Sequence, residues 1–256
     1  MKSSSRESLC TLVVLLLLSG PGVQAAEVKV IAGAAFAPAM KVLGPQFERS
    51  TGHTLVVEYG ILGALKTRLD SGEKFDVAIV PAALLDAATG QGRIVGGTRA
   101  GLVRVGMAVA VRAGAARPDI GSIDAFRRAL LNASEIAYPP EGAIGVHLAK
   151  VLGQLGIAEQ MKVKTHALKT VELVAPTLAA GEAELGFAPS TVFAGASGVE
   201  VLGPFPPELQ SYVQLSAGVG ASAAQPEAAR SLIKHLTSPE AVAVFKAKGF
   251  EPSLGK

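Results

Sequence analysis

The sequence contains a single cysteine, Cys10, within a short N-terminal segment that we expect to be removed. Without that residue the remaining chain can form no disulfide bond, holds no thiol nucleophile and cannot build a cysteine-ligated metal site. Cysteine redox chemistry and structural zinc are therefore excluded as functions of the mature chain.

Charge of one sign is not concentrated anywhere in the sequence. Lys and Arg number 24 against 21 Asp and Glu, a formal net charge of +3. No run of basic residues of the kind that nucleic-acid binders show is present, so we expect no nucleic-acid partner. Beyond the N-terminal segment, hydrophobic residues occur only in runs too short to cross a membrane.

The motifs of hydrolases, metalloenzymes and nucleotide-binding enzymes are missing as well. The four histidines show no HExxH spacing, and the chain has neither a Gly-x-Ser-x-Gly elbow nor a P-loop. Ser71-Gly72-Glu73-Lys74 matches Ser-x-x-Lys but follows a helical pattern instead of starting one. We therefore predict a binding protein with no catalytic residue, no metal and no cofactor, and keep a periplasmic enzyme as the alternative.

Residues 1–25 have the pattern of a secretory signal peptide. Met1–Ser8 is polar with two basic residues, Leu9–Leu18 is apolar, and Val23-Gln24-Ala25 resembles a processing site. The apolar run is too short for a transmembrane helix. We expect this segment to direct the chain to the periplasm.

The stretch Val28–Met40 predicts a strand, a tight turn and a helix. A β-branched run stops at small residues, Ala32–Ala35, and Pro38 lies near the first turn of a helical pattern. In an open α/β sheet ligands bind at such a turn, because the free N–H groups of the helix start favour an anion. The alternative is an ordinary turn whose residues are small for packing.

Strands and helices alternate along the rest of the chain. Strand patterns cover residues 54–58, 75–80, 135–138, 161–167 and 183–188, and two long extended runs cover 101–111 and 212–219. Each long run can leave one sheet and enter another. The pattern predicts an α/β fold of two Rossmann-like lobes joined by a double-crossover hinge, with residues 26–105 and 218–256 in lobe 1 and residues 106–217 in lobe 2.

The order of these segments resembles the periplasmic solute-binding proteins of ABC importers with the type II two-lobed fold, and among them the molybdate-binding receptors. The resemblance spans nearly all of the chain after residue 25. It rests on VIAGAAFAPAM (30–40), FDVAIV (75–80), the Gly-rich turn near 142, AAGEAELGFA (179–188) and SPEAVAVFKAKGF (238–250). It implies two lobes that close on a small anion and a membrane permease as partner.

The resemblance also implies where the ligand binds. Carried over residue by residue, it places ligand-binding residues in the turns and helix starts of both lobes. They are Ala35, Phe36, Ile61, Leu62, Gly63, Ala143, Ile144, Thr170, Val171 and Ser190. In that family backbone N–H groups, hydroxyl groups and one tyrosine hold a tetrahedral oxyanion.

The chain departs from the family where side chains should donate to the anion. Ala35 stands in place of a serine, Ile61 and Leu62 replace two hydroxyl residues, and Pro189 replaces the tyrosine. A hydrogen bond to a charged group contributes about 1.5–3 kcal/mol, and tenfold in affinity is about 1.4 kcal/mol. These losses are expected to weaken oxyanion binding by roughly three orders of magnitude.

Two ligands and two roles remain open at this point. The resemblance implies a molybdate-like oxyanion. The departures favour an organic carboxylate whose charged end meets the amides while Phe36, Ile61 and Leu62 cover its body; the alternative is that these side chains point into the lobe cores. The bound receptor would serve a permease or a sensor kinase, and we expect it to be a monomer.

Overall fold

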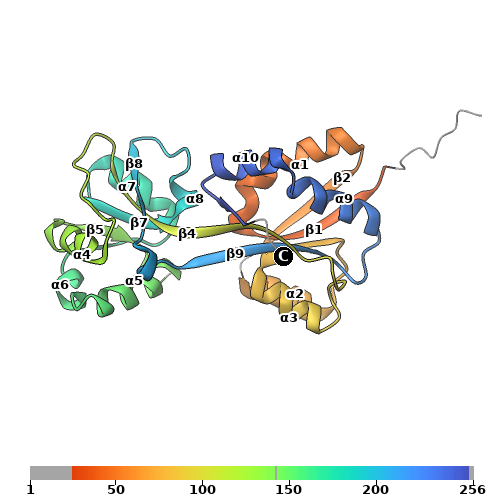
Figure 1. Cartoon of the computed structure of the whole chain (residues 1–256), viewed down its shortest axis with the longest axis horizontal. Coiled ribbons are helices and arrows are strands. Elements are labelled where there is room, and N and C mark those ends of the chain that lie inside the picture. Colours follow the sequence, from red (N-terminus) through yellow and green to blue (C-terminus); the bar gives the residue numbers. More distant parts are fainter. Residues whose placement is uncertain (1–24, 61, 142, 254–256) are drawn as a thin grey trace, which may run out of the picture.

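The computed structural model describes residues 25–60, 62–141 and 143–253 and shows two α/β lobes joined by crossing strands (Figure 1). The expected signal peptide therefore lies outside the described residues except for Ala25. Each lobe has a sheet between two layers of helices, as predicted. No helix in the described part of the chain is long and apolar enough to cross a membrane.

The sheet of lobe 1 contains three parallel strands, each followed directly by a helix, with β1 in the middle. The C-terminal helices return to this lobe and pack beside α1 on one face, while α2 and α3 cover the other face. The elements are β1 (Glu27–Gly33), η1 (Ala34–Phe36), α1 (Ala37–Thr51), β2 (Thr54–Gly60), α2 (Leu62–Ser71), β3 (Val77–Pro81), α3 (Ala82–Gly90), α9 (Pro226–Leu236) and α10 (Pro239–Ala247).

Lobe 2 repeats this layout, with β5 between β6 and β7 and all three parallel. Helices α4, α5 and α6 pack on one face of the sheet, and α7 and α8 pack on the other. The elements are α4 (Ile123–Asn132), β5 (Ile136–Tyr138), α5 (Ala143–Gln154), α6 (Ala158–Lys162), β6 (Thr165–Ala167), η2 (Val171–Leu173), α7 (Val174–Ala180), β7 (Leu185–Pro189) and α8 (Ser190–Phe193).

Strand β4 (Ala100–Arg112) runs through both lobes (Figure 1). Its residues up to Gly106 pair with β9 (Tyr212–Val219), whereas those from Met107 onward pair with β7 and with β8 (Val199–Pro204). The change of partner falls beside the lobe boundary expected at 105/106. Strand β9 pairs along its whole length with β3 and the first half of β4, and the short β10 (Glu251–Pro252) also joins that half.

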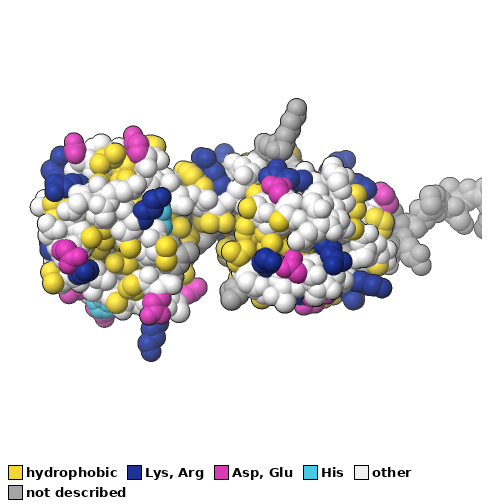
Figure 2. Space-filling model, turned by 90° about the horizontal axis from the view of Figure 1, so that it is seen from below, with side chains coloured by type: hydrophobic (Ala, Val, Ile, Leu, Met, Phe, Trp, Pro, Cys, Tyr) yellow, Lys and Arg dark blue, Asp and Glu magenta, His cyan; other side chains and the backbone are white. Residues whose placement is uncertain are grey.

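Strand directions bring the loop ends of the two sheets face to face. Strand β9 is antiparallel to β3 and β4, and β4 in turn is antiparallel to β7. Because β4 leads from lobe 1 to lobe 2, strands β1–β3 end toward lobe 2 and strands β5–β7 end toward lobe 1. The six helical segments that follow them, which begin with η1, α2, α3, α5, η2 and α8, are called the cleft-facing helix starts below. The two lobes are joined by a narrower region, called the waist below (Figure 2).

Asp76 is a buried residue of lobe 1 that holds two distant segments of the chain together. Its side chain is 2% exposed, and its two carboxylate oxygens accept hydrogen bonds from the backbone N–H groups of Lys29 and Gln225, both at 2.8 Å. Gln225 is the residue that precedes α9. The carboxylate therefore joins strand β1 to the start of a C-terminal helix 149 residues away.

Two stretches of the sequence were interpreted incorrectly. The strand expected over 161–167 is wrong in its first part, because Met161 and Lys162 end α6 and only Thr165–Ala167 is extended. Met161 is fully buried, so its apolar character marks the inner face of a short helix. Strand β8 was not predicted at all. Gly203 lies within it and interrupts the alternation of apolar and polar residues by which a strand is recognised in a sequence.

Candidate functional site

A cavity of about 630 Å³ lies between the two lobes. From lobe 1 it is lined by the start of the continuous η1–α1 segment, and from lobe 2 by the starts of η2–α7 and α8. We call it the interlobe cavity. Its lining residues are Ala34, Ala35, Pro38, Val171, Glu172, Ala175, Pro176, Pro189, Thr191, Val192, Ala196 and Ser197.

The walls of the interlobe cavity are mostly small and apolar. Its polar side chains are the hydroxyls of Thr191 and Ser197 and the carboxylate of Glu172. No Lys, Arg or His side chain is among the described residues that line it. An anionic group in this cavity would therefore meet backbone N–H groups rather than a cationic side chain.

Acidic residues are distributed unequally among the helix starts. Of the cleft-facing starts, η1, α2, α3, α5 and α8 have no acidic residue in the first turn, and only η2 has one, Glu172. Among the described residues, each helix that does not follow a parallel strand directly or through η1 or η2 has an acidic residue in its first turn: α4, α6, the short η3 (Pro207–Leu209), α9 and α10. Acidic side chains stabilise helix starts by offsetting their partial positive charge. All but one of the cleft-facing starts keep that charge uncompensated.

Side-chain caps show a related difference. Ser122 and Ser238 accept hydrogen bonds from the N–H groups of Ala125 and Ala241, each at 3.2 Å, and so cap α4 and α10. At the interlobe cavity, the residues that precede η1 and η2 make no such bond; that before η2 is Thr170, which is exposed. The first N–H groups of these two segments are left without a side-chain acceptor.

Two of the expected site residues meet in the interlobe cavity: Ala35 from lobe 1 and Val171 from lobe 2. Leu62 and Gly63 begin α2 and are exposed, Leu62 by 59%, but they do not line this cavity. Ile61 lies outside the described residues.

At the start of α5 the Ile144 side chain packs inward. Ala143 is its first residue, and the Ile144 side chain is buried in the core of lobe 2. Gly145 is required here, because a Cβ atom would lie 2.1 Å from the carbonyl oxygen of Pro140. Ile144 is not among the residues that line the interlobe cavity.

The expectation that the Phe36 side chain covers a ligand is wrong. Phe36 is fully buried in the core of lobe 1, with its ring centroid 5.7 Å from that of Phe245 and 5.8 Å from that of Phe250. The alternation of the chain through η1 turns Ala35 outward and Phe36 inward. Its aromatic ring holds the cavity wall in place rather than contacting what lies in the cavity.

Ser190 makes a contact between the lobes that sequence reasoning did not foresee. Its hydroxyl donates a 2.7 Å hydrogen bond to the carbonyl oxygen of Gly249, which follows α10 in lobe 1. Gly249 itself lies against α8, where a Cβ atom would come within 2.8 Å of the Ser190 carbonyl oxygen. Ser190 therefore ties the two lobes beside the interlobe cavity and does not line it.

Sequence reasoning missed several residues of the cavity wall. They lie one turn beyond the starts that were considered, or in the loop after α8: Glu172, Ala175, Pro176, Thr191, Val192, Ala196 and Ser197. A helix presents the residues of its first two turns to whatever lies at its start. Extending each expected site by one helical turn would have found Glu172 and Ala175.

Two tyrosines and a lysine near the waist lie outside the cavity wall. Tyr59 is the second-to-last residue of β2, and burial raises the pKa of its hydroxyl. Tyr138 ends β5 and is buried, while Lys169 is exposed before η2. No group of three His, Cys, Asp or Glu residues in the described part of the chain is arranged to hold a metal ion.

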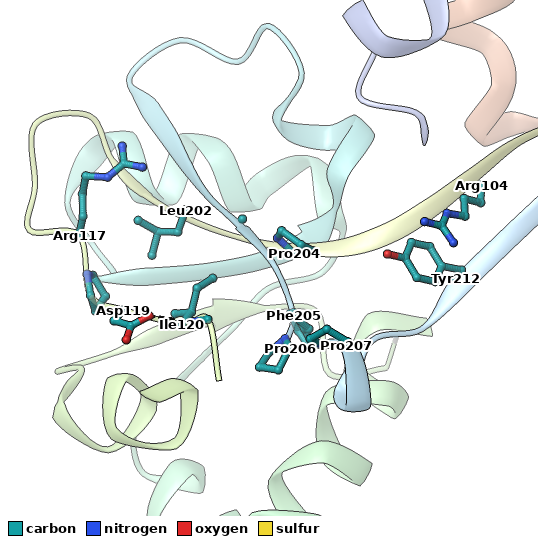
Figure 3. Close-up of a pocket in the computed structure, with 13 residues that line it drawn as sticks. Arg104, Arg117, Asp119, Ile120, Leu202, Pro204, Phe205, Pro206, Pro207 and Tyr212 are labelled. Carbon is teal, nitrogen blue, oxygen red and sulfur yellow. Dashed lines mark hydrogen bonds between the residues drawn. The ribbon is translucent and has the colours of Figure 1, made fainter. Parts of the chain in front are cut away.

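A second hollow of about 640 Å³ lies on lobe 2 beside the hinge (Figure 3). Arg104 lies over the ring of Tyr212 at 4.1 Å from its centroid and bonds Glu251 at 2.7 Å, and Arg117 pairs with Glu200. Both guanidinium groups therefore already have acidic partners. The hollow contains no helix start that follows a parallel strand, so the interlobe cavity is the better candidate site.

The chain resembles known proteins over most of its length. Residues 28–251 match a family described as bacterial extracellular solute-binding protein. The chain is 33% identical over 258 residues to the molybdate-binding protein ModA of Azotobacter vinelandii, which covers 95% of this chain and 98% of that protein. It is 29% identical over 247 residues to a protein of a Pseudomonas species named aconitate isomerase, with 93% and 94% covered.

A solved structure shows the same fold. A substrate-binding domain assigned to a molybdenum ABC transporter of Clostridium difficile superposes with a TM-score of 0.79 at 19% identity, covering 90% of this chain and 100% of that domain. At this level of identity the likeness establishes the two-lobed architecture alone.

Proposed function

The chain belongs to the family of bacterial extracellular solute-binding proteins, and from this premise we propose that it is the receptor of an ABC importer whose ligand is a small organic carboxylate. The ligand binds in the interlobe cavity, and the lobes close on it about the β4 and β9 strands. Residues 1–25 act as the signal peptide that takes the chain to the periplasm. The closed monomer then docks to a membrane permease.

The observation that carries this proposal is the absence of acidic residues from five of the six cleft-facing helix starts. Their uncompensated N–H groups favour a negative charge in the gap. The absence of cationic side chains from the described cavity wall means that this charge is met by backbone dipoles alone.

The apolar wall supports a carboxylate over a bare oxyanion. Pro38, Val171, Ala175 and Val192 offer contact area to a hydrocarbon body, and the hydroxyl groups that the molybdate-binding family uses are replaced at Ala35 and Leu62. A tetrahedral oxyanion has no apolar part to place against such a wall. We infer that Ala35 and Val171 contact the ligand and that Leu62, Gly63 and Thr170 approach it on closure.

Calorimetry tests the proposal on the chain from Ala26 onward. Titrations with molybdate and with a panel of carboxylates of two to nine carbons are expected to give at least one carboxylate that binds 100-fold more tightly than molybdate. Mass spectrometry of the purified protein under non-denaturing conditions should show the same class of solute. Molybdate binding more tightly than every carboxylate would overturn the ligand assignment while leaving the receptor role intact.

Turnover of a carboxylate is a second candidate function, favoured by the similarity to a protein named aconitate isomerase. A shift of a C–H proton needs a proton acceptor beside the substrate, and Glu172 is the one ionisable side chain on the described cavity wall. Incubation with aconitate and chromatographic separation of its isomers measures this directly. Isomer formation that Glu172→Gln abolishes would establish an enzyme, and an unchanged substrate would leave binding as the function.

A further inference from the structure

Glu172 is the exception among the cleft-facing helix starts. It lies in the first turn of η2 and lines the interlobe cavity. Its side chain is exposed and makes no hydrogen bond or ion pair with any residue that the structure describes. A carboxylate with no partner of its own therefore stands on the lobe 2 wall of a cavity that otherwise favours anions.

The two walls of the cavity consequently differ in charge. On the lobe 1 wall, neither η1 nor α1 has an acidic residue in its first turn. On the lobe 2 wall, the Glu172 carboxylate offsets the partial positive charge of the η2–α7 start. Lys169, three residues earlier, is exposed and is not among the residues that line the cavity.

We propose that Glu172 determines which carboxylates the protein accepts. It directs the ligand's anionic group to the lobe 1 wall, and it requires a hydroxyl or ammonium group on the side of the ligand that meets lobe 2. This inference rests on the proposed function, because it concerns the same cavity.

The chemistry of closure supports this role. When the lobes close, the Glu172 carboxylate loses water and must receive a hydrogen bond or stay unpaired at a cost. A hydroxyl or ammonium group on the ligand supplies that bond, and a charge-assisted bond of this kind is a strong one. A tetrahedral dianion that contacts both walls would instead lie beside the Glu172 carboxylate. The repulsion between these like charges disfavours its binding. Glu172 thus selects for one solute class and against another with a single group.

Matched solutes and one substitution test the inference. Two series differ only at one position: succinate, malate and aspartate, and 3-phenylpropionate, 3-phenyllactate and phenylalanine. The probe for the excluded class is molybdate. Glu172→Gln removes the charge, and Glu208→Gln is the control, because Glu208 is also an exposed first-turn acid but lies in η3 and does not line the cavity. Thermal unfolding verifies that both variants are folded.

In the wild type, the hydroxyl or ammonium member of at least one series is expected to bind tenfold or more tightly than its unsubstituted member. Glu172→Gln should bring these members within threefold of each other and strengthen molybdate binding at least tenfold, and Glu208→Gln should change nothing. Ratios that stay the same in Glu172→Gln would overturn the role of Glu172 and leave the receptor intact. Failure of the wild type to bind any of the six carboxylates would instead overturn the proposed ligand class, and this inference with it.

Discussion

Helix starts at the waist of this molecule differ from helix starts elsewhere in whether an acidic side chain offsets their partial positive charge. Away from the waist, first-turn acids accompany α4, α6, α9 and α10, and two of these helices also have a serine cap. At the waist, five of six starts have no acid in the first turn. The molecule stabilises its outer helices with its own carboxylates, whereas most of the inner ones have none, and under the proposed function the ligand would supply that negative charge.

The difference teaches how a mostly apolar cavity wall could favour a negative charge without a cationic side chain. No side chain on the described cavity wall identifies the ligand as an anion. The indication is the missing first-turn acid at the cleft-facing helix starts, and it is recognised only when these starts are compared with the outer ones. The predictions below transfer the features of one group to the other or remove them.

The largest effect is expected where an outer helix start depends on a buried carboxylate. Asp76→Ala leaves the N–H groups of Lys29 and Gln225 without their acceptor, and we expect a loss of about 3 kcal/mol in the free energy of unfolding. Urea denaturation measures it. The control is Asp70→Ala, which breaks an exposed pair with Lys66 and should cost less than about 1 kcal/mol. Equal losses would show that Asp76 is not a structural anchor.

An acidic residue placed in the first turn of a cleft-facing helix should give that helix start the same charge compensation as the outer helix starts. Ala35 is exposed and lines the interlobe cavity, so Ala35→Asp copies the outer pattern onto η1. We expect carboxylate affinity to fall at least tenfold, about 1.4 kcal/mol, while the melting temperature is unchanged or slightly higher. Calorimetry and thermal unfolding measure the two quantities. Ala35→Asn, nearly the same size, should retain most of the affinity; if both variants lose it equally, shape and not charge is responsible.

Removing the serine caps should weaken the outer helices alone. Ser238→Ala in lobe 1 and Ser122→Ala in lobe 2 each delete one cap, and each is expected to cost about 1 kcal/mol of stability. Ligand affinity should stay within twofold of the wild type, since neither helix start faces the waist. A larger change in affinity than in stability would contradict the division into two groups.

The smallest effect concerns the acid that accompanies one of those caps. Hydrogen bonds from its own backbone N–H group and from the Ser238 hydroxyl lower the pKa of Glu240. Because the folded pKa is depressed, its contribution to stability is complete above the ordinary glutamate pKa and is lost as the pH falls through the lowered value. An NMR titration should find the depressed pKa and find it closer to normal in Ser238→Ala. An unshifted carboxyl in the wild type would contradict this account.

Much of the architecture could be predicted because hydrophobic periodicity and turn chemistry agree along the chain. Gly52 ends α1 in the left-handed conformation, with φ of 74°, as its position after an apolar helical pattern predicts. Strand β9 covers exactly the run expected from 212 to 219, and Ser238 caps α10 as its sequence indicates. An Asp within the buried apolar run FDVAIV is expected to serve backbone donors, and Asp76 accepts two such hydrogen bonds.

The site was harder to predict, because neighbouring residues in a short helix face opposite ways. Ala35 and Phe36 are adjacent in the sequence, yet one lines the cavity and the other is fully buried. Resemblance gives the position of a turn but not the direction of each side chain in it. Glu172 was overlooked for a similar reason, since the expected site ended at Val171, and its meaning comes only from its neighbours in the other lobe.

The thirteen residues of β4 have a consequence for how the molecule comes apart. One continuous strand supplies a ladder to each sheet, its residues up to Gly106 to lobe 1 and those from Met107 onward to lobe 2. We therefore expect neither half to be stable when expressed alone, and the whole chain to melt in a single cooperative step. The strand about which the proposed closure takes place would then also make the two lobes one folding unit.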